Sequence, residues 1–208
     1  YKINMINKDI FDNIYSKKIW NNGNSLIPLS GPGSSLKNAK ECSEKLNEYI
    51  YTKRLNSVLD LGCGDLTWIT LAPFFNDDDI IYTGVDVVSY LIDTHKLKYP
   101  SKTFICEDLV FFKNMKHSSV IILRDIIFHL KNEEILTIFE NIKNKFEFLL
   151  ITSCNNLTNL DTFDKYHFSQ KNLHKPPFNK NYNYNVSIYE KAFDRNVYIY
   201  SHDNFYSN

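Results

Sequence analysis

The apolar residues near the N-terminus recur at helical spacing. They are three to five positions apart, which is typical of short amphipathic helices. These residues are Ile3, Ile6, Ile10, Ile14 and Ile19. A loop rich in Gly, Pro and Ser follows over residues 23–35, and helical spacing returns over residues 36–54. We therefore expect helices ahead of the main part of the fold.

Beyond residue 56, short and continuously apolar runs alternate with helical segments. Such runs are typical of strands whose two faces are both covered, and their alternation with helices predicts a parallel sheet. The expected strands are 57–61, 80–86, 103–106, 120–123 and 146–152, and the expected helices are 65–72, 88–98 and 132–145. After a polar, irregular stretch over residues 154–185, segments 186–189 and 197–200 are predicted to pair as antiparallel strands.

These elements predict an α/β fold with a doubly wound sheet of about seven strands, the last pair antiparallel, and an N-terminal helical cap. We expect a cap and lid segment over residues 1–40 and a main domain over residues 41–208. A chain of 208 residues with 43% hydrophobic and 23% charged residues is long enough to build one such core.

Charge and cysteine usage narrow the functional classes. The chain has 24 Lys and Arg against 24 Asp and Glu, and this balance argues against a dedicated nucleic-acid binder. Apolar runs fall short of the ~20 residues of a membrane helix, and the first 20 residues show no signal-peptide pattern. The four cysteines fit no metal-binding spacing, so we expect no metal, free thiols and a cytoplasmic protein.

The strongest local motif is VLDLGCGD, over residues 58–65. It places Gly62 and Gly64 directly after a predicted strand, where glycine permits a tight turn and a close approach of backbone N–H groups to a ligand. Thr67 stands where a dinucleotide-binding fingerprint has its third glycine. Turn geometry alone also accounts for two glycines, so the context of the motif decides its meaning.

Acidic residues supply that context, because several lie at the ends of predicted strands. Asp86 follows Gly64 by 22 residues, the usual place of a carboxylate that accepts hydrogen bonds from ribose hydroxyls. Ligands of open α/β sheets bind beyond the carboxyl ends of the strands. The acidic residues at or near such ends are Asp60, Asp86, Asp108 and Asp125.

The motifs VLDLGCGD, YTGVDVV, FICEDL and VIILRDIIFHL together resemble the successive motifs of class I S-adenosylmethionine (SAM) methyltransferases, which have a Rossmann-like fold. The resemblance covers residues 57 to about 153. SGPGSS (residues 30–35) and NLHKPPF (residues 172–178) extend it. With CGD and RDIIFHL they resemble a group of methyltransferases associated with glycan and polysaccharide synthesis.

The resemblance implies SAM as cofactor and assigns a role to each matching residue. Asp60, Gly62 and Gly64 would hold the methionine part of SAM. Asp86 would bind the ribose, and Val87 would pack on the adenine. Asp108 would accept a hydrogen bond from the adenine amino group with Leu109 beside it, and Arg124 and Asp125 would line the methyl-transfer cleft.

A general base is expected near the fourth predicted strand. His129 lies four residues after Asp125, and on a helix both would face one side. Histidine is the commonest general base, so we expect His129 to take the acceptor proton and Asp125 to orient it or the acceptor hydroxyl. A packed histidine that anchors the turn is the alternative, and His167 and His174 are rival bases. The remaining histidines are expected at the surface: His95, His117 and His202.

Two further segments are candidates for a lid and an acceptor pocket. We interpret SGPGSS as a flexible lid that closes over SAM beside Trp20, and the alternative is a plain linker. Its residues with a candidate role are Ser30, Gly31, Gly33 and Ser34. We interpret NLHKPPF as part of an acceptor pocket shaped by Asn172, His174 and Phe178, and the alternative is a structural connector.

The sequence thus predicts a SAM-dependent O-methyltransferase that acts on a sugar hydroxyl of a nucleotide-sugar or a glycan. The alternatives are methylation of another small molecule or of a nucleic-acid end, and an inactive SAM-binding interaction module. The expected partner is a small-molecule or glycan acceptor rather than nucleic acid or a membrane.

Overall fold

The computed structural model of the protein describes residues 6–161 and 168–207. The chain forms two compact units, Tyr1–Phe111 and Phe112–Asn208. The boundary expected at residue 40 stays a prediction, and that residue lies within a helix, α2.

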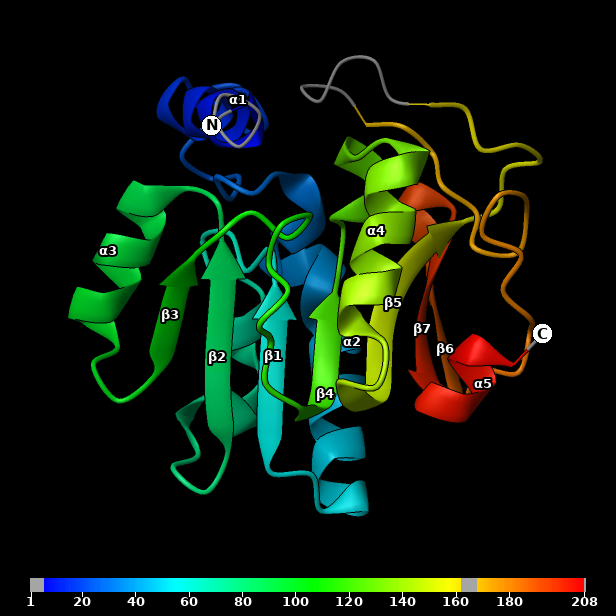
Figure 1. Ribbon diagram of the computed structural model, residues 1–208. Coiled ribbons are helices and arrows are strands. Elements are labelled where there is room, and N and C mark those ends of the chain that lie inside the picture. Colours follow the sequence, from blue (N-terminus) through cyan, green and yellow to red (C-terminus); the bar gives the residue numbers. More distant parts are fainter. Residues whose placement is uncertain (1–5, 162–167, 208) are drawn as a thin grey trace. The chain divides into compact units, whose positions relative to one another are not determined.

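In residues 6–111, the described part of the first unit, three parallel strands and the helices that accompany them are found (Figure 1). Strand β1 pairs with β2, and β2 pairs with β3. In chain order the elements are α1 (Ile6–Ser16), the 3-10 turn η2 (Pro32–Ser34), α2 (Leu36–Lys53), β1 (Ser57–Leu61), the 3-10 turns η3 (Ile69–Leu71) and η4 (Pro73–Asn76), β2 (Ile81–Asp86), α3 (Ser89–Lys98) and β3 (Thr103–Cys106).

In the second unit, residues 112–161 and 168–207 form four further strands. Strand β5 runs parallel to β4 and antiparallel to β7, and the last two strands of the chain, β6 and β7, pair antiparallel. In chain order the elements are β4 (Ser118–Leu123), the 3-10 turn η5 (Ile127–His129), α4 (Asn132–Ile142), β5 (Phe146–Cys154), β6 (Val186–Glu190), the 3-10 turn η6 (Lys191–Phe193), β7 (Arg195–Ser201) and α5 (His202–Tyr206).

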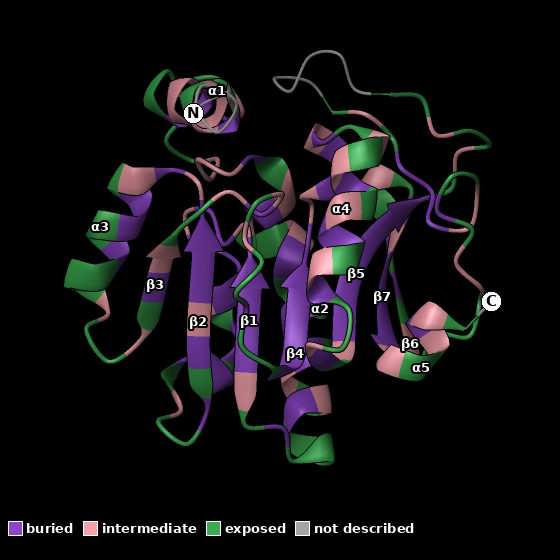
Figure 2. Ribbon diagram, viewed as in Figure 1, coloured by how far each residue is buried: buried purple, intermediate pink, exposed green. Residues whose placement is uncertain are grey.

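The strand order of the sheet is β3-β2-β1-β4-β5-β7-β6. This mixed sheet of seven strands with flanking helices and an antiparallel last pair confirms the fold class predicted from the sequence. All six residues of β4 are buried, as are the last six of β5 (Figure 2). Continuous burial explains why these strands read as unbroken apolar runs.

Helix α2 confirms the helical spacing of residues 36–54. Ala39, Cys42, Leu46 and Ile50 recur every three or four positions and form its buried face. Arg54 follows the last helical residue with a left-handed backbone (φ 56°), and its N–H group donates to the carbonyl oxygens of Ile50 and Tyr51 in the last turn.

The expected helix over residues 65–72 is wrong. Leu66 takes a left-handed backbone (φ 62°), which a regular helix does not permit, and between Leu66 and Pro73 the described chain forms a single 3-10 turn, Ile69–Leu71. Asp65 accepts a hydrogen bond from the N–H of Thr67, two residues on, in a tight turn.

The short helix α5 closes the second unit against the sheet. Phe205 is fully buried, and its ring contacts Phe139 of α4 and Tyr200 of β7 with centroids 5.1 and 5.5 Å apart. Such edge-on aromatic contacts fill space that a smaller side chain would leave empty.

We expect Phe205→Ala to lower the free energy of unfolding by about 3–5 kcal/mol, because it leaves a cavity under α5. Chemical denaturation measures the change. Leu157→Ala, at a residue that is 81% exposed, is the matched control and should change stability by less than about 0.5 kcal/mol. Equal stability of the two variants would contradict the packing described for α5.

Candidate functional site

The glycine-rich loop after β1 folds back onto the end of β2. Gly62 and Gly64 have left-handed backbones, with φ of 78° and 57°. The N–H groups of Gly62 and Cys63 both donate to the carbonyl oxygen of Val85, at 2.8 and 3.0 Å. The turn that the sequence predicted is therefore held by the neighbouring strand.

Asp86 ends β2 and carries the central carboxylate of this region. Its Oδ2 accepts a hydrogen bond from the N–H of Gly64 at 2.9 Å, and its Oδ1 accepts one from Val88 at 3.0 Å. Burial raises the pKa of Asp86, although these hydrogen bonds act in the opposite sense. Val87, beside it, is half-buried. The carboxylate is thus fixed in direction where β1 and β2 end.

Asp60 lies inside β1 rather than at its end. Its carboxylate is buried and accepts a hydrogen bond from the hydroxyl of Tyr82 on β2 at 2.7 Å. Burial, together with the charge of Asp60, raises the pKa of Tyr82 well above its usual range, so this hydroxyl remains a donor. The pair links the first two strands just below the glycine-rich loop.

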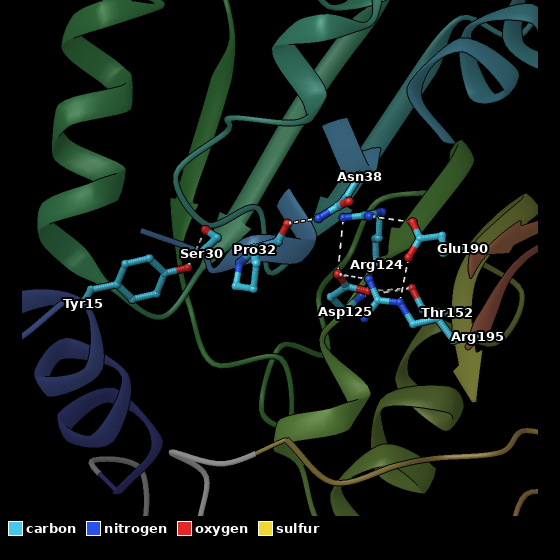
Figure 3. A network of polar contacts seen from close by, with 9 residues as sticks. All are labelled: Tyr15, Ser30, Pro32, Asn38, Arg124, Asp125, Thr152, Glu190 and Arg195. Carbon is cyan, nitrogen blue, oxygen red and sulfur yellow. Dashed lines mark hydrogen bonds and ion pairs between the residues drawn. The ribbon is translucent and has the colours of Figure 1, made fainter. Parts of the chain in front are cut away.

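The segment before α2 lies directly on the glycine-rich loop. Ser30 and Asp65 bind each other twice: the Ser30 N–H donates to Asp65 Oδ2, and the Asp65 N–H donates to Ser30 Oγ, each at 3.0 Å. The hydroxyl of Tyr15, from α1, lies 2.8 Å from Ser30 Oγ (Figure 3). We call residues 6–35 the cap and these three residues the latch.

Helix α1 continues the cap across the ends of β2 and β3. The side-chain amide of Asn7 donates to Asp108 Oδ2 at 2.8 Å, and Lys8 Nζ lies 3.2 Å from the hydroxyl of Ser89. Asp108 Oδ1 accepts from the N–H of Val110 at 3.0 Å, and Leu109 is buried. Asp108 therefore already binds an NH2 group, the kind of donor that an adenine amino group would offer.

Apolar packing secures the cap on α3. Tyr15 forms a buried cluster with Val88 and Leu91. Trp20 packs on this cluster, 5.4 Å from the Tyr15 ring, and a Cβ built on Gly31 would lie 3.5 Å from Trp20 Cβ. The structure thus brings together Trp20 and the SGPGSS segment, in which Gly31 and Ser34 are buried and Gly33 is half-buried.

His95 corrects an expectation, because it is buried rather than at the surface. It lies on the face of α3 that carries Leu91 and Ile92, and its Nε2 is 2.7 Å from the carbonyl oxygen of Gly64. Burial lowers its pKa. The spacing of Leu91 and His95, four residues apart, was the signal in the sequence for this inward position.

In the second unit, Asp125 follows β4 in a left-handed conformation with φ 62°. Its Oδ1 accepts a hydrogen bond from the hydroxyl of Thr152 on β5 at 3.1 Å, and its Oδ2 accepts one from Arg195 at 2.8 Å (Figure 3). Arg124 Nη1 lies 3.3 Å from the same Oδ2. Two arginines and a threonine therefore hold this carboxylate.

His129 is the last residue of the 3-10 turn η5 and is half-buried. The helix on which its alignment with Asp125 was argued does not form, so the four-residue spacing does not by itself place the two side chains on one face. The role of His129 as a base stays a prediction. Its rival His167 lies outside the described residues.

The residues singled out in NLHKPPF make internal contacts. Asn172 is 5% exposed, and its amide donates to the carbonyl oxygen of Asn156 at 2.7 Å. His174 stacks on Tyr182 with centroids 3.7 Å apart, and Phe178 packs on Phe139. Burial lowers the pKa of His174.

Across residues 6–161 and 168–207, no group of three or more His, Cys, Asp or Glu side chains is placed to hold a metal ion. None of the helices there has the length and apolar character to cross a membrane. Of the four free cysteines, three are buried and Cys106 is exposed.

Comparisons with known proteins place the fold. No family model matches the sequence, and no curated protein matches it. Among solved structures, magnesium protoporphyrin IX methyltransferase of Synechocystis with bound SAM matches with a TM-score of 0.64 and 12% identity, over 94% of this chain and 94% of that one. Mitomycin 7-O-methyltransferase matches with a TM-score of 0.61 and 9% identity, over 82% of this chain and 55% of that one.

An O-methyltransferase family protein from Burkholderia thailandensis matches with a TM-score of 0.57 and 12% identity, over 82% of this chain and 57% of that one. At such identities the likeness defines the fold alone. The chain therefore has the fold of these methyltransferase structures, as the motifs between residues 57 and 153 predicted.

Several residues of the site were missed by sequence reasoning. In α1, the helix was predicted from its isoleucines. The face turned to the strand ends is instead formed by Asn7, Phe11 and Tyr15, which lie four residues apart. The four-residue spacing of these side chains was the signal in the sequence. No signal in the sequence pointed to Glu190 and Arg195, because a charged residue at the end of a strand is usually solvated.

Gly64→Ala should loosen the cap, because a Cβ there would lie 2.4 Å from Ser30 Oγ and 2.9 Å from the Tyr15 hydroxyl. Amide hydrogen exchange over residues 6–35 should become faster. Gly23→Ala is the matched control: its φ is 69°, and a Cβ there meets nothing within 4 Å. It shares the backbone strain of ~1–2 kcal/mol without the clash. Equal exchange of the cap in both variants would contradict the latch.

Proposed function

We propose that the protein is a SAM-dependent methyltransferase that transfers a methyl group to an oxygen acceptor, a sugar hydroxyl of a nucleotide-sugar or glycan. The observation that carries the proposal is the set of groups at the ends of β1, β2 and β3. A tight glycine loop, the fixed carboxylate of Asp86 and the carboxylate of Asp108 meet under one cap.

The residues present fit the parts of SAM. Asp86 offers fixed acceptors for ribose hydroxyls, and Val87 lies beside it for the adenine. Asp108 binds an NH2 donor from Asn7 and would bind the adenine amino group in the same way. The Asp65 N–H, which donates to Ser30 Oγ, would serve the methionine carboxylate together with the loop of Gly62 and Gly64, while Asp60 supports the loop from below.

When bound, SAM supplies a methyl group on a positively charged sulfur that is already a good leaving group. The protein's task is then to position the acceptor and to receive its proton. We assign the proton to the imidazole of His129 and the orientation of the acceptor to Asp125, with Arg124 beside it. The cap, with Trp20 and the SGPGSS residues Ser30, Gly31, Gly33 and Ser34, would exclude water as a lid does.

The choice of acceptor rests on three lines of support. The net charge of zero disfavours a nucleic-acid substrate. The set SGPGSS, CGD, RDIIFHL and NLHKPPF resembles methyltransferases associated with glycan synthesis, and there we keep Asn172, His174 and Phe178 as contributors to acceptor binding. Two structural neighbours are named for a porphyrin and for mitomycin, which supports a small acceptor. The buried free thiols support a cytoplasmic location.

The decisive experiment is a screen of nucleotide-sugars and glycans with SAM, read as a mass gain of one methyl group and as release of S-adenosylhomocysteine. Turnover with a sugar supports the proposal. Turnover only with other small molecules or with nucleic-acid ends moves the protein to those classes. SAM binding without any turnover favours the inactive binding module.

Asp86→Ala should weaken SAM binding, because it removes the acceptors for two ribose hydroxyls at ~1.5–3 kcal/mol for each charged hydrogen bond. Calorimetry measures the affinity, and Asp78→Ala, at an exposed loop residue, is the control. Circular dichroism verifies the fold. Unchanged SAM affinity in a folded Asp86→Ala variant would rule out this role for Asp86.

His129→Ala should lower kcat by ~10²–10⁴-fold, the usual size of a general-base contribution, with SAM affinity unchanged. Turnover of the wild type should fall as the pH decreases, because a protonated imidazole accepts no proton. His117→Ala, at an exposed histidine of the same unit, is the control. A lower melting temperature together with weaker SAM binding would instead indicate that His129 is a packed, structural histidine. Near-normal turnover would reject His129 as the base and make His167 and His174 the next candidates.

A further inference from the structure

Four charged side chains in the second unit close a ring of alternating sign. Glu190 binds both arginines, with Oε1 2.7 Å from Arg124 Nη2 and Oε2 2.6 Å from Arg195 Nε. Asp125 Oδ2 also binds both, 2.8 Å from Arg195 Nη2 and 3.3 Å from Arg124 Nη1 (Figure 3). We call these four residues the charge ring.

The ring is buried, and its charges sum to zero. The side chains of Arg124, Glu190 and Arg195 are 1%, 5% and 4% exposed, whereas that of Asp125 is 22% exposed. Burying charged groups is costly unless each has close partners of opposite sign. Asp125 is the member through which this ring reaches the surface of the unit.

The ring joins strand ends that are distant in sequence. Arg124 and Asp125 follow β4, Glu190 is the last residue of β6, and Arg195 is the first residue of β7. The Arg195 guanidinium also lies 4.4 Å from the Phe193 ring centroid. The turn end of the β6–β7 hairpin thereby fixes Asp125, which follows β4.

Hydrogen-bond capacity shows what Asp125 has left to offer. A carboxylate has about four lone-pair positions, two on each oxygen. Oδ2 faces two arginine nitrogens, and Oδ1 accepts from the Thr152 hydroxyl, which also accepts from the Asp125 N–H at 3.1 Å. One position on Oδ1 is therefore left for an external donor.

We propose that Asp125 binds a hydroxyl group of the methyl acceptor through Oδ1 without taking its proton, and that Arg195 and Glu190 are positioning residues that aim this carboxylate. The inference rests on the proposed function and deepens it. It separates two tasks at the end of β4, since Asp125 orients the acceptor and another group removes the proton.

The charges around Asp125 support an ionised state. Burial alone would raise its pKa, but Arg124 and Arg195, with the hydrogen bonds from Thr152 and Arg195, outweigh burial and lower the pKa. The other titratable groups around the ring are Glu190 on β6, Cys154 on β5 and Asp194 in the hairpin turn. Burial raises the pKa of Cys154 to about 11, so this thiol stays neutral.

The first test needs no acceptor. A carboxyl carbon NMR titration of the wild-type protein, with the Asp125 signal identified by its loss in Asp125→Asn, should show an ionised carboxylate down to below the ordinary Asp value of about 3.9. In Arg195→Gln the titration midpoint of Asp125 should rise by about one pH unit or more, because one of the two positive charges that offset its burial is removed. A wild-type midpoint at or above the ordinary value overturns the proposal, whether or not the variants fold.

The second test uses the nucleotide-sugar that gives the highest turnover in the screen. Arg195→Gln should raise its KM roughly 10- to 100-fold, with SAM affinity by calorimetry unchanged. Glu190→Gln, which keeps the shape and removes one charge, should raise KM less, and Arg195→Lys should recover part of the loss. Glu140→Gln removes the carboxylate of an exposed ion pair in the same unit and should change neither.

The outcomes separate the ring from the proposed function. A lower melting temperature with unchanged KM in Arg195→Gln shows a purely structural ring and overturns the positioning role. If no nucleotide-sugar is methylated, the proposed function fails on its own, and the NMR titration still decides whether the ring holds Asp125 ionised.

Discussion

The return of the chain onto β2 at residues 62–65 is the constraint on which the first unit's site depends. Gly62 and Gly64 must take left-handed conformations for the amides of Gly62 and Cys63 to reach the Val85 carbonyl and for the amide of Gly64 to reach Asp86. This return also leaves no room for a side chain at Gly64, since the latch fills that space. One turn thereby sets the direction of a carboxylate and the seat of the cap.

The parts of the fold that the sequence predicted are those governed by burial alone. Strands buried on both faces leave apolar runs, and the amphipathic face of α2 leaves a helical period, so both were found. The helix expected over residues 65–72 failed because the left-handed Leu66 outweighs local propensity. His95 was expected at the surface because histidine is polar. Its partner, the carbonyl oxygen of Gly64, comes within reach only when the glycine-rich loop has folded.

The polar contacts around the glycine-rich loop and those of the charge ring show which features a single sequence does not predict. Asp86 and Asp125 were visible as acidic residues at strand ends, and their positions follow from the alternation of strands and helices. The arginine partner of Asp125 was not visible, because Arg195 reaches it from a segment whose approach depends on tertiary packing. The same holds for Ser30, which reaches Asp65 in the glycine-rich loop from the cap. A residue's place along a strand can be predicted from pattern, whereas the hydrogen bonds that orient it are decided by the rest of the fold.

The sequence separations of these contacts also order events during synthesis. Ser30 and Asp65 are 35 positions apart, so the latch can close while much of the chain is still unmade. The ring spans 66 positions from Arg124 to Glu190 and 70 from Asp125 to Arg195, and it waits for the start of the last strand to emerge from the ribosome. Until then Arg124 and Asp125 lack Glu190 and Arg195, so the arrangement at the end of β4 is completed late in synthesis.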